Sequence, residues 1–157
     1  MLAQGERLPA DWISHPFLRD ISAEYLSVLK ACAMMTEFQP GQVIFREGEI
    51  ANRFYVILRG RVAIEQNSPG LVPKAIDFAA DGEVLGWSWL FPPYEVHFTA
   101  RVVAATEAVF FYGTWLRQRC EENPALGYEL AKRVASVATR RLEALLSQPF
   151  RNDADSL

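Results

Sequence analysis

The chain has 157 residues and a mass of 17.7 kDa, and 50% of its residues are hydrophobic while 22% are charged. A chain of this size forms one domain that buries roughly 70% of its unfolded surface. The composition excludes collagen-like, low-complexity and fully disordered proteins. Sixteen Lys and Arg against nineteen Asp and Glu leave a net charge of -3. This balance disfavours direct nucleic-acid binding, because such affinity comes mainly from basic groups that neutralise phosphates.

The cysteines and the apolar segments narrow the class of protein further. Cys32 and Cys120 are far apart, and the chain contains no Cys-x-x-Cys motif. This spacing excludes a structural zinc site and argues against a disulfide framework. No stretch approaches the roughly 20 apolar residues of a membrane span, and the N-terminus lacks the basic and apolar regions of a signal peptide. We therefore expect a cytoplasmic protein with reduced thiols and no membrane association.

The N-terminal region predicts a lead-in, a turn and one helix. Residues 1–12 are mixed in character, and we expect them to form a flexible lead-in followed by a short turn at residues 15–17. Ser22 is placed to accept hydrogen bonds from the free amides at the start of a helix. The helix is predicted over residues 23–31.

Residues 34–112 have the pattern of an all-β unit. Short runs of β-branched and aromatic residues are separated by turn residues roughly every ten positions, which is typical of a barrel or sandwich. The runs read AMMTEF, QVIF, FYVILRG, RVAIEQ, KAIDFA, HFTARVVAA and EAVFFYG. Counting one weak pairing, they predict about eight strands. The fold class is therefore mainly β with flanking helices, an eight-stranded β-roll or jelly-roll barrel.

Two helices are predicted after the strands. Thr114 is placed to cap a short helix that ends near Glu122, and Asn123 before Pro124 is a capping pair for the closing helix. The closing helix carries an apolar stripe at three- and four-residue steps, with Lys132 and Arg133, as well as the later arginines 140 and 141, off that stripe. The stripe consists of Leu126, Leu130, Val134, Ala138, Leu142 and Leu145. Residues 149–157 are expected to form a disordered tail.

One run of residues resembles a known family. The run is Phe38-x-x-Gly41-x-x-Ile44-Phe45-x-x-Gly48-x-x-Ala51-x-x-Phe54-Tyr55-Val56-Ile57-x-x-Gly60-x-Val62. It resembles the first half of the cyclic-nucleotide-binding domain, the sensor module of catabolite-activator-type bacterial regulators. The resemblance implies one domain over residues 13–148, and the family's DNA-reading domain does not fit into the residues that follow. The glycines of the run need no ligand to explain them, because each fits a tight turn.

The family resemblance also implies a phosphate-binding cassette. In the family a Gly-Glu pair precedes a short helix, and an arginine precedes a small residue and an alanine. Gly82-Glu83 matches the pair, so Glu83 would accept a ribose hydroxyl, and a helical turn near Val84 would direct amides at the phosphate. Thr99-Ala100 matches the small pair, which places Phe98 at the arginine position. Arg101 is expected on the opposite face of the strand.

The segment between Glu83 and Phe98 is longer than the family pattern and rich in aromatic residues. Such side chains favour an apolar or filled pocket over a polar phosphate site, so cyclic nucleotides are disfavoured and no cofactor is certain. We expect the pocket either to bind a less polar small molecule or to be plugged. The candidate binding residues are Gly82, Glu83, Val84, Leu85, Trp87, Trp89, Phe98, Thr99 and Ala100.

Catalytic and metal sites find no support in the sequence. Residues 86–90 begin like the nucleophile turn of a serine hydrolase, but Leu90 stands where that motif needs glycine. His97 has only Glu95 nearby, which is too few groups for a metal site. We therefore expect no enzymatic activity.

Three functional hypotheses remain from the sequence. The first is a stand-alone small-molecule sensor or adaptor with a degenerate cassette. The second is a protein-interaction module without a ligand, whose aromatic insertion binds a partner protein. The third is a true cyclic-nucleotide sensor that uses Glu83, backbone amides and His97. In each case the closing helix predicts a homodimer, because its apolar stripe is longer than the β unit needs.

Overall fold

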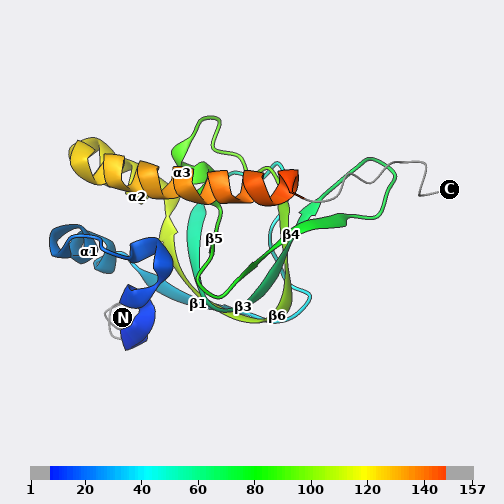
Figure 1. Cartoon of the computed structure of the whole chain (residues 1–157), viewed down its shortest axis with the longest axis horizontal. Coiled ribbons are helices and arrows are strands. Elements are labelled where there is room, and N and C mark those ends of the chain that lie inside the picture. The colour runs from blue at the N-terminus through cyan, green and yellow to red at the C-terminus, as the bar shows by residue number, and fades with distance from the viewer. Residues whose placement is uncertain (1–7, 148–157) are drawn as a thin grey trace.

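The computed structural model describes residues 8–147, and its centre is a six-stranded antiparallel sheet (Figure 1). The strand order is β1-β6-β3-β4, while β2 pairs with β6 and β5 pairs with β3. The strands are β1 (Met34–Phe38), β2 (Val43–Phe45), β3 (Arg53–Gln66), β4 (Lys74–Ala80), β5 (Val84–Leu85) and β6 (Thr99–Tyr112). The mainly β class is confirmed, but the expected eight strands and closed barrel are not.

The difference arises because two strands are unusually long. β3 and β6 have 14 residues each, and each joins two of the runs that the sequence separates. Their pairing shifts register between Ile57 and Val62, so the ladder is locally disrupted there and the pair bends. Gly60 lies at this bend with φ 130°, and a Cβ there would be 2.6 Å from the Cα of Thr106. Only glycine allows the strands to approach this closely.

The N-terminal segment packs against the sheet through short helices. The 3-10 helices η2 (Ala10–Ser14) and η3 (Pro16–Leu18) precede α1 (Ala23–Lys30). The capping role of Ser22 is confirmed, since its hydroxyl accepts from the Tyr25 amide at 3.3 Å. Trp12 is buried in the core, so the packed part of the domain begins earlier than the predicted boundary at residue 13.

Two helices follow the sheet, α2 (Gly113–Glu122) and α3 (Pro124–Leu146). The Asn123 cap is confirmed by its side chain, which accepts from the Leu126 amide at 3.2 Å. The Thr114 cap is wrong, because α2 begins at Gly113 and Tyr112 occupies the cap position. Close packing sets this start, since a Cβ on Gly113 would lie 2.9 Å from the Trp89 Cβ. The predicted tail at 149–157 lies outside the described residues.

Figure 1 shows α3 running along the open side of the curved sheet, with α1 and α2 at the end where α3 begins. The core has two parts. One part lies between the sheet and the helices and contains Trp12, Phe54, Trp89, Leu126 and Leu130. The other lies inside the curve of the sheet and includes Ile57, Val62 and Phe110. None of the helices in the range 8–147 is both long and apolar enough to cross a membrane.

Candidate ligand-binding site

The predicted cassette begins at the turn between β4 and β5. Gly82 has φ 82° and lets the chain reverse, and the Glu83 amide donates to the Ala80 carbonyl at 3.0 Å. Val84 and Leu85 then form β5, which pairs with Val56 and Tyr55 of β3. The predicted helical turn near Val84 is therefore wrong. The edge of β3 accepts this segment as a strand, and both side chains are buried.

The short helix of the segment starts three residues later. It is the 3-10 helix η4 (Trp87–Leu90), preceded by Gly86 at φ 79°. A Cβ on Gly86 would lie 2.6 Å from the Arg53 carbonyl oxygen, so this position also requires glycine. The order glycine, then short helix, is thus realised by Gly86 and Trp87. Trp87 stands directly at the helix start, where the cassette pattern has its acid.

Four of the predicted site residues line one small cavity. They are Val84, Leu85, Trp87 and Phe98, and the wall is completed by Phe45, Ile64, Gly86, Ser88, Val96, His97 and Arg141. The cavity volume is about 30 Å³. That volume admits one or two water molecules, whereas pockets for drug-sized ligands usually have roughly 300–1,000 Å³. The aromatic rings of Trp87 and Phe98 line the space at the two cassette positions.

Five predicted site residues lie outside this cavity, and three of them are packed in the protein interior. Trp89 is fully buried in the core, with its ring 5.9 Å from that of Phe54. Thr99 is buried, and its hydroxyl accepts from the Glu47 amide at 3.1 Å and from the Asn67 side chain at 3.2 Å. Ala100 is fully buried inside the curve of the sheet. All three have a structural role that needs no ligand.

The aromatic insertion packs against the body of the protein instead of projecting from it. Trp87 is half-buried, and the Tyr94 ring is covered by the Arg117 guanidinium at 4.0 Å. Arg117 also donates to the Trp89 carbonyl at 2.7 Å. Phe91 is the large apolar side chain of the insertion that is exposed. The insertion therefore offers a partner protein a smaller aromatic surface than its sequence suggests.

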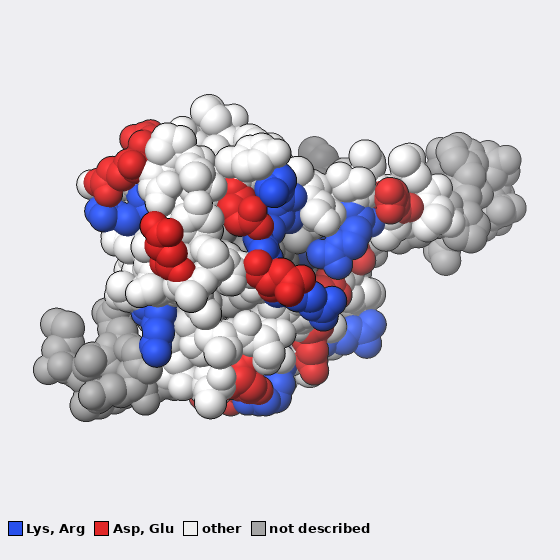
Figure 2. Space-filling view, turned by 60° about the vertical axis from the view of Figure 1, so that its left-hand side comes forward, with Lys and Arg blue, Asp and Glu red and all other residues white. Residues whose placement is uncertain are grey.

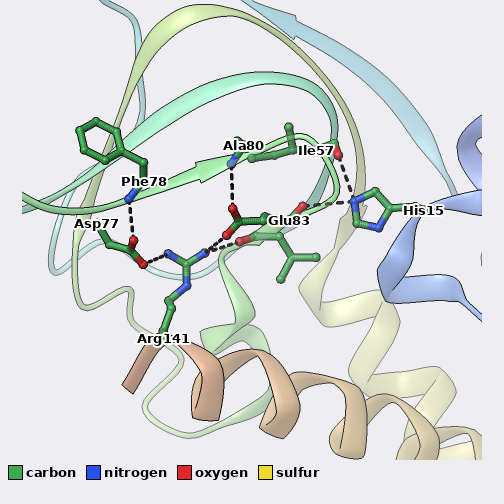
Figure 3. A network of polar contacts seen from close by, with 8 residues as sticks. His15, Ile57, Asp77, Phe78, Ala80, Glu83 and Arg141 are labelled. Carbon is green, nitrogen blue, oxygen red and sulfur yellow. Dashed lines mark hydrogen bonds and ion pairs between the residues drawn. The ribbon is translucent and has the colours of Figure 1, made fainter. Parts of the chain in front are cut away.

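Arg141 of α3 reaches the cassette, and sequence reasoning missed it (Figure 3). Its Nη1 lies 3.3 Å from an Asp77 carboxylate oxygen, and its Nη2 donates to the Val84 carbonyl at 2.9 Å. The same Nη2 lies 4.0 Å from a Glu83 carboxylate oxygen. Only 12% of the Arg141 side chain is exposed. The sequence contained one signal that Arg141 faces the core. It follows the buried residues Val134 and Val137 at steps of three and four residues, which place all three on one face of α3.

His15 joins the same network from the N-terminal segment, and it was also missed. Its Nδ1 accepts from the Phe17 amide at 3.0 Å, which leaves the proton on Nε2. Nε2 donates to the Ile57 carbonyl at 2.9 Å and to the Glu83 carbonyl at 3.2 Å. Burial lowers the pKa of His15, so the neutral ring is favoured. His15 thus holds the Gly82-Glu83 turn from the side opposite to Arg141 (Figure 3).

Gly82 and Glu83 line a second cavity of about 240 Å³. It lies between α3, β4 and the β4–β5 turn, and it shares Val84 and Arg141 with the first cavity. Its other lining residues are Phe17, Asp77, Phe78, Val137, Arg140 and Ala144. The structure therefore divides the predicted site between two cavities that meet at Arg141.

The remaining polar groups of the sequence analysis lie apart from this site. Arg101 pairs with Glu65 at 3.3 Å and lines neither cavity, as its strand position predicts. Burial raises the pKa of the Cys32 thiol to about 12 and also raises the pKa of Cys120, so both thiols are unreactive. Among residues 8–147, no group of His, Cys, Asp and Glu could hold a metal ion. Basic side chains (blue) and acidic side chains (red) are interspersed on the face that Figure 2 shows.

The family model for the cyclic nucleotide-binding domain matches residues 35–123. This chain belongs to that family. The matched range contains the cassette segment and both long strands, and the recognition made from the glycine-containing run is confirmed.

Solved structures agree with this family, and one curated enzyme matches this chain over a small part of its length. A putative cyclic nucleotide-binding protein from Geobacter metallireducens GS-15 is 28% identical, with a TM-score of 0.75 over 82% of this chain and 93% of that one. A cyclic nucleotide-binding domain from Methylobacillus flagellatus is 18% identical, with a TM-score of 0.73 over 85% of this chain and 77% of that one. Lysophospholipase nte1 of Neurospora crassa is 29% identical over 71% of this chain but only 7% of its own length. The chain thus spans a small part of that enzyme.

Proposed function

We propose that this domain is a sensor or adaptor of the cyclic-nucleotide-binding fold that does not bind cAMP or cGMP tightly. The observation that carries the proposal is the first cavity, whose volume of about 30 Å³ is far below what a nucleotide occupies. Trp87 and Phe98 line it at the two positions where the cassette pattern has its acid and its arginine. A cyclic phosphate placed there would meet aromatic carbon, and burying an unpaired charge is costly.

Arg141 supports the same conclusion. It is the cation that lines the first cavity, but its guanidinium is already engaged by Asp77 and the Val84 carbonyl. To bind a phosphate, Arg141 would have to give up these contacts. Each hydrogen bond to a charged group is worth about 1.5–3 kcal/mol, so this exchange offsets most of the gain.

Calorimetric titration of the wild type and of Phe98→Arg with cAMP and cGMP tests the proposal. We expect the wild type to bind no tighter than high micromolar. Phe98→Arg adds one charge-assisted pair and should raise the affinity about tenfold or more. Val103→Arg is the matched control, because it adds the same charge at an exposed position of β6, the strand that begins directly after Phe98. It should leave the affinity unchanged.

A double variant tests whether Trp87, at the start of η4, also keeps the nucleotide out. Trp87→Glu with Phe98→Arg removes both rings and supplies both polar groups of the cassette pattern. We expect it to bind cAMP more tightly than Phe98→Arg alone, because Trp87 also occupies the site. Submicromolar binding by the wild type would instead favour the true cyclic-nucleotide sensor that uses Glu83, backbone amides and His97.

A further inference from the structure

The second cavity is a pocket that the proposed function leaves unused. It opens between α3 and the β4–β5 turn, and its volume of about 240 Å³ is slightly below the range for drug-sized ligands. It is large enough for a small metabolite, because a water molecule in the liquid takes roughly 30 Å³. Trp87 and Phe98, which line the first cavity, do not line this one.

The charges of the second cavity are balanced and lie on opposite walls. Asp77 on β4 and Glu83 on the turn carry negative charge, while Arg140 and Arg141 of α3 carry positive charge. A simple anion would be attracted by the arginines and repelled by the carboxylates. A simple cation would be attracted by the carboxylates and repelled by the arginines. Net charge therefore gives neither of them an advantage.

The pairing inside the cavity leaves one group of each sign available. Arg141 is held by Asp77 at 3.3 Å and by the Val84 carbonyl at 2.9 Å. The Arg140 side chain is exposed and has no ion pair or hydrogen bond with another residue in the range 8–147. The Glu83 side chain is 45% exposed, with one carboxylate oxygen accepting from the Ala80 amide at 3.3 Å and the other 4.0 Å from Arg141 Nη2. Arg140 thus offers an unpaired positive charge, and the exposed Glu83 carboxylate keeps acceptor capacity for a ligand.

The rest of the wall is apolar. Phe17, Val137 and Ala144 contribute carbon surface, and the Phe78 ring adds an aromatic edge. A ligand that fits must combine one anionic group, one cationic group and a short apolar portion. Free α-amino acids with an apolar side chain have this combination.

We propose that the second cavity binds a free apolar α-amino acid. Its carboxylate pairs with Arg140, its ammonium group pairs with Glu83, and its side chain packs on Val137 and Phe17. Such a ligand would lie directly on the turn that His15 and Arg141 hold (Figure 3). This inference rests on the proposed sensor function and gives it a ligand class, but the ligand binds in the second cavity and not in the first. Cyclic-nucleotide titrations therefore test the proposed function, and amino-acid titrations test this inference.

Calorimetry with L-leucine, L-methionine and L-phenylalanine provides the test. We expect saturable binding of at least one of them with a dissociation constant below about 1 mM. For L-leucine, the analogues 4-methylpentanoate and 3-methylbutan-1-amine each lack one charged group and should bind at least tenfold more weakly. No binding of any of the three amino acids at 10 mM overturns the proposal. Equal binding of 4-methylpentanoate also overturns it, since the site would then be an anion site.

Variants locate the binding in the cavity. Arg140→Gln and Glu83→Gln remove one charge each and should weaken amino-acid binding at least fivefold. Lys132→Gln removes a charge from the same helix away from the cavity and should have no effect. The Arg140 side chain is exposed, so its variant is expected to remain folded, which far-UV circular dichroism checks. Binding that neither variant weakens would lie elsewhere and would contradict the proposal.

Discussion

Arg141 and His15 reach the Gly82-Glu83 turn from opposite ends of the chain. Arg141 contacts the turn through Nη2, and His15 through Nε2, so the conformation of the turn depends on both. Neither residue is near the turn in sequence. Local patterns such as capping spacings and motif matches therefore could not predict the contacts, although they correctly placed Gly82 and Glu83 in a turn.

His15 makes the stability of the domain dependent on pH. Because burial lowers its pKa in the folded state, the unfolded chain binds the proton more readily. The stabilising contribution is present above roughly pH 6.5, the pKa of a free histidine, and is lost as the pH falls through the lower pKa of the folded state. Protonation of Nδ1 also removes the acceptor of the Phe17 amide.

Thermal unfolding between pH 8 and pH 5 tests this role. We expect the wild-type midpoint to fall with pH and His15→Ala to show a smaller fall. At pH 8 the variant should be less stable by about 1–3 kcal/mol, because buried groups lose their partners. His97→Ala is the matched control, since His97 is exposed, and it should keep the wild-type pH dependence. A His15→Ala curve parallel to that of the wild type would contradict the assignment.

Helix α3 has two apolar faces, only one of which the sheet covers. Leu126, Leu130 and Val134 of the predicted stripe are buried, whereas Leu142 is 56% exposed. A second apolar face continues at three- and four-residue steps, and its members are exposed or half-buried. The exposed members are Tyr128, Ala135 and Leu142, and the half-buried ones are Ala131, Ala138 and Leu145. This repeat is the spacing of a helix-pairing seam, and it supports the homodimer predicted from the sequence.

The dimer prediction is tested by the mass in solution. We expect light scattering at tens of micromolar to give twice 17.7 kDa. Leu142→Glu should shift the protein to the monomer, because it places a charge in the seam. Ser136→Glu adds the same charge to the polar side of α3 and should leave the dimer intact. A wild-type mass of 17.7 kDa would rule out the dimer.

Sequence patterns predicted elements well where a local rule decides them. The caps of Ser22 and Asn123 follow from side-chain chemistry that needs no tertiary contact. Strand ends were predicted less well, because β3 and β6 continue through bends that read as breaks in the sequence. The short helix was predicted to begin near Val84 but begins at Trp87, because Val84 and Leu85 pair with β3 as a strand. This tertiary contact has no signal in the local sequence.

At the scale of the whole molecule, the run of glycines identified the family, but the site depended on contacts between distant elements. Phe98, which the sequence pattern places at the arginine position, lines the first cavity. The second cavity could not be predicted, because Arg140 and Arg141 come from α3, Asp77 from β4 and Glu83 from the turn. Only the packing of α3 along the sheet brings these charges together.

The net charge of -3 leads to a prediction for the whole molecule. We expect no sequence-specific DNA binding by this chain and only weak, salt-sensitive association with any duplex. Acidic and basic side chains alternate on the face in Figure 2, so phosphates would meet both signs. Fluorescence anisotropy with random duplexes at physiological salt measures this. Nanomolar binding to a defined sequence would contradict the prediction.

A crystal structure of the wild type grown with millimolar cAMP tests the central claim most directly. We expect Trp87 and Phe98 to keep their places, the first cavity to hold no nucleotide, and Arg141 to stay on Asp77 and the Val84 carbonyl. The contradicting result is cAMP in the first cavity with its phosphate bound by a displaced Arg141.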